Sequence, residues 1–190
     1  MWEFVPNSAF FLFVINIMFN LANSLIGPII LLYVVDDLGI SPVSWSKLLT
    51  VLFISMIVSS IPLGKLVDRM GRKASIFISQ ALWMVAIILL INGNLFRLFI
   101  AMPLVGMLNI LSYTSISALF ADLIPKTQRG KAMGFRNFFS SIIMAVGQLL
   151  GGVLYDKVSH LAPLLLQFVL MIPSLVLTLI LIEEPKAKED

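Results

Sequence analysis

Long apolar runs alternate with short polar joints along this sequence. Each run has about 20 residues, the length that an α-helix needs to cross the hydrocarbon layer of a bilayer. The alternating polarity of membrane β-strands is absent, and the runs are too long for such strands. We therefore predict an all-α membrane protein, a six-transmembrane-helix bundle that forms a single domain over residues 1–190, with spans near Ala9–Val35, Trp45–Leu66, Ala74–Ile91, Leu98–Ala121, Ala132–Tyr155 and Leu161–Ile182.

Four prolines lie inside these runs, at Pro28, Pro62, Pro103 and Pro173. Membrane helices tolerate a proline as a kink where neighbouring groups satisfy the freed backbone. We therefore expect all four spans that contain a proline to continue through it.

The composition excludes several classes of protein. Hydrophobic residues make up 59% of the 190 residues and charged residues only 12%, about half the charged fraction of soluble domains. A soluble core of this size could not hold so many apolar side chains. The absence of cysteine excludes disulfides and thiolate chemistry. The net charge of +3, without a dense basic cluster, argues against a nucleic-acid partner.

Basic residues gather on one side of the predicted bundle. Three bases lie on the opposite side, Lys47, Arg97 and Lys157. Cytoplasmic joints of membrane proteins carry an excess of Lys and Arg, so we predict a cell-membrane protein with both termini in the cytoplasm. The ten bases assigned to that side are Lys65, Arg69, Arg72, Lys73, Lys126, Arg129, Lys131, Arg136, Lys186 and Lys188.

The joint after the second span, "GKLVDRMGRKA" (64–74), has an order that charge bias alone does not explain. Asp68 lies at the end of a predicted helix, where the helix dipole disfavours a carboxylate, so it should have a cationic partner. Gly64 allows another backbone to approach closely, and Gly71 permits a sharp turn.

This joint resembles the loop signature of the major facilitator superfamily, G-x-L-x-D-R-x-G-R-[KR], between the second and third helices of a half. The resemblance implies a cytoplasmic latch, in which Asp68 and nearby bases hold one conformation closed; Arg72, Arg129, Lys131 and Arg136 are the candidate partners of Asp68. The latch residues that we assign are Gly64, Asp68, Arg69, Gly71, Arg72, Lys73, Arg129 and Arg136.

Two further stretches are similar to the family. "ADLIPKTQRGKAMG" (121–134) looks like its joint between the fourth and fifth helices. "GQLLGG" (147–152) is similar to an antiporter pattern, but Gln148 stands where that pattern has proline. Small-residue helix packing by Gly147, Gly151 and Gly152 explains this stretch equally well, so it does not indicate antiport.

Two helix ends point to an internal repeat, because "GKLVDR" (64–69) and "GVLYDK" (152–157) share G-x-L-x-D followed by a base. They lie on opposite faces of the predicted bundle, as an inverted repeat of three plus three helices requires. The resembling family has two six-helix halves, and this chain covers one. Its ending, "IEEPKAKED", favours the C-terminal half.

Polar residues concentrate in the first and fourth spans, which line the central cavity in the resembling family. Asparagines at Asn16, Asn20 and Asn23 share one helical face. Hydrogen bonding between helices is the alternative role for such residues, and for the serines and threonines we favour it. The candidate cavity residues are Asn16, Asn20, Asn23, Asn109, Ser112 and Tyr113.

These features predict transport of a small solute by alternating access, with a second six-helix half or a homodimer partner. A non-transporting remnant or accessory protein with the same half-fold stays open. A membrane-embedded enzyme is less favoured, because no paired acid, activated nucleophile or metal cluster is evident. We expect no catalytic residues, metal or cofactor. His160 is expected to be a solvated loop residue, and no ionisable residue is expected deep inside a span.

The orientation can be tested with a reporter that is active only in the cytoplasm. Because the base-rich joints should face the cytoplasm, a fusion at the C-terminus should be active and a fusion after His160 silent. The opposite result would show that the predicted orientation is wrong.

Overall fold

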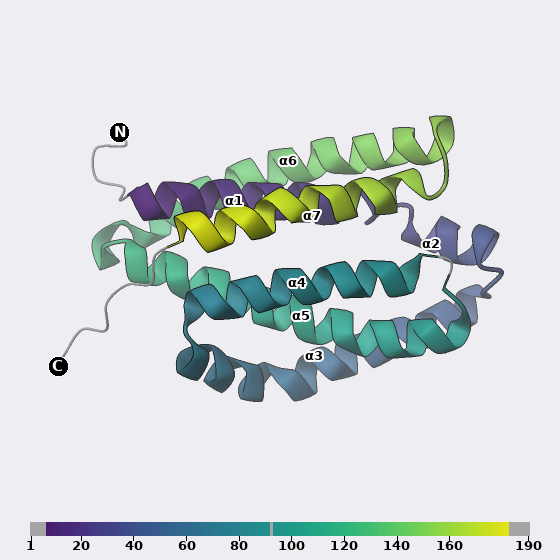
Figure 1. The fold of residues 1–190 in the computed structure, drawn as a ribbon, viewed down its shortest axis with the longest axis horizontal. Coiled ribbons are helices and arrows are strands. Elements are labelled where there is room, and N and C mark those ends of the chain that lie inside the picture. Colours follow the sequence, from purple (N-terminus) through teal and green to yellow (C-terminus); the bar gives the residue numbers. More distant parts are fainter. Residues whose placement is uncertain (1–6, 92, 183–190) are drawn as a thin grey trace.

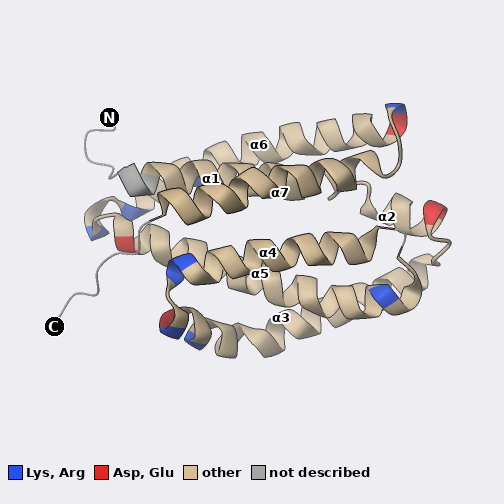
Figure 2. Cartoon of the chain, in the orientation of Figure 1, with Lys and Arg blue, Asp and Glu red and all other residues tan. Residues whose placement is uncertain are grey.

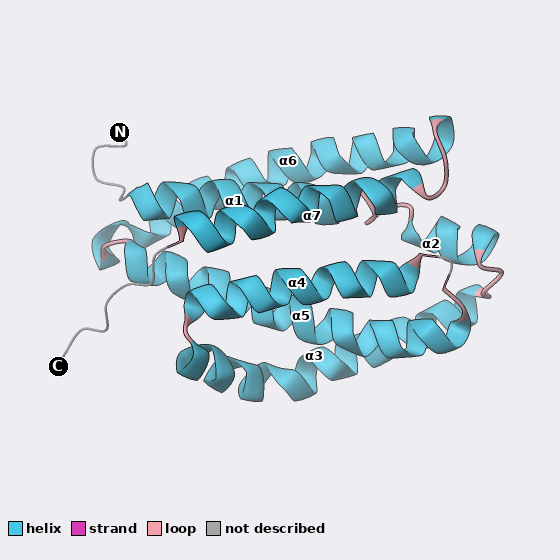
Figure 3. Cartoon of the chain, viewed as in Figure 1, coloured by secondary structure: helices cyan, strands magenta, loops and turns pink. Residues whose placement is uncertain are grey.

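The computed structural model describes residues 7–91 and 93–182, with side chains from Phe10 onward. Every regular element in these ranges is a helix (Figure 3), so the prediction of an all-α fold is confirmed. The elements are α1 (Asn7–Ser24), α2 (Ile30–Leu32), the π-helical turn η1 (Tyr33–Asp37), α3 (Pro42–Met70), α4 (Arg72–Leu90), α5 (Leu95–Leu123), the 3-10 turn η2 (Lys126–Gln128), α6 (Arg129–Lys157) and α7 (Ala162–Leu181).

Five of the described helices are long and apolar enough to cross a membrane, and α1 contributes a shorter apolar segment, Phe10–Ser24. The five are α3, α4, α5, α6 together with η2, and α7. The expected span over Ala9–Val35 is not one helix, because α1 ends at Ser24 and helical structure resumes at Ile30.

The interruption of the first span follows from two adjacent residues. Pro28 has no N–H to donate, and Gly27 before it is a poor helix former. The amides of Ile29 and Ile30 instead both bond to the carbonyl of Ile26, at 3.0 and 2.9 Å. The other prolines, Pro62, Pro103 and Pro173, lie inside α3, α5 and α7 without ending them, as expected.

The helices form two layers (Figure 1). In one layer α1 packs against α6 and α7, and in the other α5 packs against α3 and α4; α4–α7 and α1–α5 contacts join the layers. In chain order the long helices form two triplets, α1, α3 and α4, and then α5, α6 and α7. The first helix of each triplet packs against the last two helices of the other triplet. An inverted repeat would produce this exchange, although the repeat itself stays a prediction.

Glycines allow two pairs of helices to approach closely. A Cβ atom on Gly106 would overlap Ser55 Oγ, which joins α5 to α3. Cβ atoms on Gly147 and Gly151 would overlap Ser24 Oγ and the carbonyl oxygen of Leu25, so α6 lies against the end of α1. Small residues commonly permit such contacts between membrane helices.

The remaining glycines of interest are open. A Cβ atom on Gly64 or Gly152 would meet open space, with no neighbouring atom within 4 Å among the described residues. Gly71 has a φ of 89°, a conformation that favours glycine, and it forms the turn between α3 and α4.

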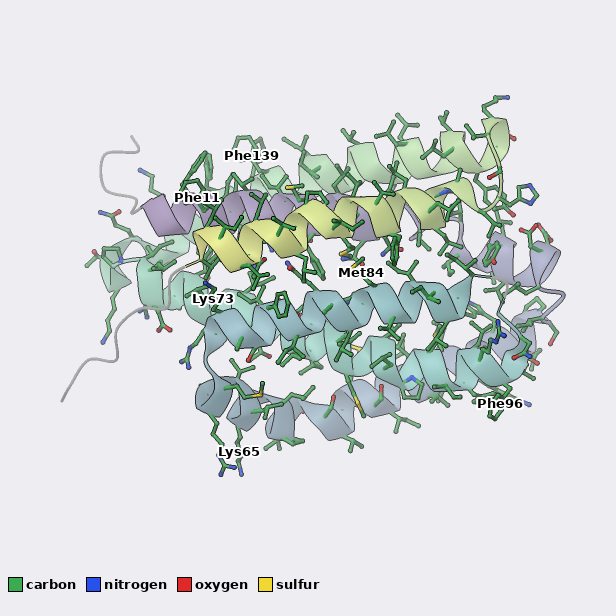
Figure 4. The ribbon with its side chains drawn as sticks, viewed as in Figure 1. Phe11, Lys65, Lys73, Met84, Phe96 and Phe139 are labelled. Atoms are coloured by element: carbon green, nitrogen blue, oxygen red, sulfur yellow. The ribbon has the colours of Figure 1, made fainter. Side chains whose placement is uncertain are left out.

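A buried polar cluster joins α4 to α7. Gln80 Nε2 donates to Ser174 Oγ at 3.1 Å, and Thr178 Oγ1 donates to Gln80 Oε1 at 3.0 Å. All three side chains are almost fully buried. Met84 points from α4 toward α7 one turn along (Figure 4). Hydrogen bonds of this kind contribute about 0.6–2 kcal/mol between membrane helices.

The two ends of the bundle differ in charge (Figure 2). α3 ends and α4 begins at one end, where Lys65 and Lys73 project (Figure 4), and α6 also begins there. The opposite end carries Asp36 and Asp37 in η1 and only a few bases.

His160 is exposed in the turn after α6, as expected, and its ring also has partners there. Its Nδ1 lies 2.7 Å from Asp37 Oδ1, and its ring stacks on Tyr155 with centroids 4.2 Å apart. The Tyr155 hydroxyl donates to the other Asp37 oxygen at 3.0 Å. This cluster fastens the end of α6 to η1.

The contact at Gly151 gives a direct test of helix packing. Gly151→Ala should lower the free energy of unfolding by about 1–3 kcal/mol, because the added methyl group has no room against the Leu25 backbone. The neighbouring Gly152→Ala should have no effect or stabilise, because its methyl group meets open space and alanine favours helix. Thermal unfolding of the chain in mild detergent measures both, and equal midpoints would contradict the packing described.

Candidate solute cavity

A cavity of about 470 Å³ lies between α1, α5 and α6. Its size is within the range of sites for small ligands. Most of the residues that line it have polar side chains, although the bundle around it is largely apolar. The lining residues are Asn16, Phe19 and Asn20 from α1, Asn109, Ser112, Tyr113, Ile116 and Ser117 from α5, and Arg136, Asn137, Ser140, Ser141 and Met144 from α6.

A hydrogen-bonded trio joins the α1 wall to the α6 wall. Asn20 Nδ2 donates to Asn16 Oδ1 at 3.0 Å and to Ser140 Oγ at 3.2 Å, and Ser140 Oγ donates to Asn16 Oδ1 at 3.4 Å. Asn16 is buried and the other two are half-buried. These residues therefore both line the cavity and link the helices, so the two roles weighed for the asparagines coexist here.

The α5 wall offers groups that are less engaged. Ser112 Oγ is buried without a hydrogen-bond partner among the described residues. Tyr113 is 70% exposed. Asn109 Nδ2 donates to the Val105 carbonyl one turn earlier, at 3.0 Å. The side-chain Oδ1 of Asn109 takes no part in that bond. One helix therefore brings a hydroxyl without a described partner, an exposed phenol and an exposed amide to the cavity wall.

Arg136 lies at the cavity, where no ionisable group was expected. Its guanidinium carbon is 5.3 Å from the centre of the Phe120 ring, a cation–π arrangement. One terminal nitrogen, NH1, is buried without a hydrogen-bond partner among the residues described. The side chain turns from α6 toward α5, which a count of residues from the helix start does not reveal.

Asn23 lies away from the cavity. Its Nδ2 donates to the Phe19 carbonyl at 2.9 Å, and its Oδ1 accepts from Gln167 Nε2 at 3.0 Å. It therefore joins α1 to α7 instead of facing the solute space.

The joint between α3 and α4 contains an acid–base cluster. Arg72 NH1 lies 3.4 Å from Asp68 Oδ1, and Arg72 Nε lies 3.2 Å from Asp122 Oδ2 at the end of α5. Asp68 is 70% exposed. Among the candidate partners of Asp68, the structure pairs it with Arg72, whereas Arg129 Nε donates to the Ile124 carbonyl and Arg136 lies at the cavity.

Comparison with known proteins places this arrangement in a family. The Major Facilitator Superfamily profile matches residues 12–190. The chain belongs to the Major Facilitator Superfamily. The charged joint and the two-layer bundle are thus those of a multi-pass membrane protein in this superfamily, as the resemblance predicted.

Two relatives are similar to the chain over most of its length. The chain is 29% identical to the "Uncharacterized MFS-type transporter C18.02" of Schizosaccharomyces pombe, over 87% of this chain and 38% of the relative. It is 25% identical to the "Quinolone resistance protein NorA" of Staphylococcus aureus, over 95% of this chain and 46% of the relative. The chain therefore spans less than half the length of these relatives.

The α6 wall was not predicted for this superfamily member. Arg136, Asn137, Ser140 and Ser141 recur at intervals of about one helical turn, so they share one face of the helix. That periodicity was available in the sequence. It did not enter the prediction, because the resembling family lines its cavity with the first and fourth helices.

Proposed function

We propose that this chain moves a small solute across the cell membrane by alternating access, as one six-helix half of a secondary transporter. The observation that carries the proposal is the polar cavity between α1, α5 and α6 in an otherwise apolar bundle. Secondary transporters hold their solutes in such cavities at the interface of helix repeats.

A second six-helix half or a second copy of the chain completes the proposed transporter. Within the apolar stretch of each helix, the buried share is only 17% in α3 and 11% in α6. The corresponding share is 44% in both α4 and α5. Open glycines at Gly64 and Gly152 lie on these two helices. The low burial supports a partner or lipid on the outer faces of α3 and α6. Separately, we place the base-rich end in the cytoplasm because cytoplasmic joints carry an excess of Lys and Arg.

The name of one relative gives a first solute to test. Because NorA is a quinolone resistance protein, we propose a fluorescent quinolone as the initial probe of transport. Uptake into liposomes should require the dimer, or the chain together with a second half, because one half supplies only part of the cavity wall. Uptake by a monomer, established by cross-linking and mass measurement, would contradict the need for a partner.

Ser112 offers a test of the cavity itself. Ser112→Ala should slow transport several-fold while leaving the thermal midpoint unchanged or slightly raised, because it removes a buried hydroxyl that has no partner among the described residues. Ser115→Ala is the matched control, since Ser115 lies on the same helix but bonds to the Leu111 carbonyl at 2.7 Å and does not line the cavity. Equal transport by both variants and the unmodified protein would argue against this cavity as the solute site.

We propose that the acid–base cluster at Asp68 acts as a cytoplasmic latch, and a substitution of Asp68 tests this. Asp68→Asn should shift the inward–outward balance by about 1–2 kcal/mol, the usual scale of such couplings, because it weakens the pair with Arg72. Labelling of Thr127→Cys from each side of the membrane reports the balance, since the chain has no native cysteine.

Asp156→Asn is the control for the latch, because Asp156 forms an exposed pair with Lys157 at the opposite end. If Asp68→Asn labels like the unmodified protein in the complete assembly, the latch has no support.

A further inference from the structure

Arg136 is the charged group of the cavity wall that the proposed function leaves unexplained. We propose that its guanidinium binds a carboxylate or phosphate group of the transported solute, so that the cavity takes anions. This inference rests on the proposed function, because it names the substrate class of the same cavity.

Among the described residues, no acid forms an ion pair with Arg136. Its guanidinium stacks on Phe120, whose ring offers attraction but no hydrogen-bond acceptor. NH1 is buried and bonds to nothing among the described residues. A buried guanidinium nitrogen without an acceptor is costly, and the planar fork of the guanidinium matches a carboxylate or phosphate better than any neutral group.

The rest of the cavity wall favours the same sign of charge. The lining residues include no aspartate or glutamate, so Arg136 gives the site a formal positive charge. The Ser112 hydroxyl, which also has no partner in the described part of the chain, can donate to an anion. A cationic solute would meet repulsion from Arg136 and find no carboxylate in this wall.

Two other sources could supply an anion to Arg136. A carboxylate of a second half could pair with it permanently, and the headgroup of an anionic lipid could enter between the helices. We favour the solute because Arg136 lies in a cavity of about 470 Å³ shared with unengaged polar groups. A carboxylate of a second copy that already pairs with Arg136 would abolish the benzoate effect, and a bound lipid would appear in the titration with phosphatidylglycerol.

Three small probes of similar shape separate charge from ring binding. Benzoate, benzamide and benzylamine carry a negative, zero and positive charge at neutral pH. Thermal unfolding of the full chain is followed in an uncharged detergent as each probe is titrated, and a separate titration adds phosphatidylglycerol. We expect benzoate alone among the three probes to raise the midpoint in a saturable manner.

Variants then assign the effect to Arg136. Arg136→Gln should raise the half-saturating benzoate concentration at least about tenfold, the loss expected for a hydrogen bond to a charged group. Lys131→Gln removes the same charge from an exposed position on the same helix outside the cavity, and it should stay within about twofold of the unmodified protein. If Arg136→Gln does not fold, Arg136→Lys and Ser112→Ala should each weaken benzoate binding several-fold.

Several results would overturn the inference. These are the absence of any benzoate effect, an equal effect of benzamide, unchanged benzoate binding in the Arg136 variants, or stabilisation through Arg136 by phosphatidylglycerol alone. The readout is binding, so it is independent of transport. Benzoate binding without solute movement would contradict the proposed function only, whereas transport that Arg136→Gln leaves unchanged would contradict this inference only.

Discussion

Helices in a bilayer are already surrounded by apolar lipid, so the hydrophobic effect contributes little when they pack together. Their association depends instead on how closely their backbones can approach. Two such approaches organise this chain. Gly106 brings α5 against Ser55 of α3, and Gly147 with Gly151 brings α6 against the end of α1. Larger residues at these positions would separate the helices and widen the spaces between them.

The cavity follows from the second approach. Near the end of α1, Gly147 and Gly151 let the backbone of α6 lie close against it. Nearer the start of α6, the Asn20–Ser140 hydrogen bond joins the same two helices. Arg136 lies one turn before Ser140, where the wall is lined by long and polar side chains. One helix therefore supplies both the close contact and the solute-facing surface.

Much of the fold could be predicted from the sequence because hydrophobic run length and joint composition are local properties. The break at Gly27–Pro28 could not, because an isolated proline is tolerated within α3, α5 and α7, and its effect depends on the flanking backbone. The span of apolar residues continues through the break, so hydropathy alone does not detect it.

The cavity was predictable only in part. Asn16 and Asn20, which share a helical face, and Asn109 from the polar fourth span line the cavity. Asn23 lies on the same helical face as Asn16 and Asn20, but it accepts a hydrogen bond from Gln167, 144 residues later in the chain. No local sequence pattern reveals that partner. Arg136 was assigned only to the latch, because distance from the helix start says nothing about the direction in which a long side chain turns.

The exchange of α1 and α5 between the two layers has a consequence for biosynthesis. The partners of α5, α3 and α4, precede it in the chain, so α5 can pack as soon as it is inserted. The partners of α1, α6 and α7, are made only after α3, α4 and α5. α1 must therefore wait in the bilayer without its main neighbours until residues 129–181 have left the ribosome. During that interval its asparagines lack the Ser140 and Gln167 side chains that later bond to them, which makes α1 the segment most dependent on the insertion machinery for protection.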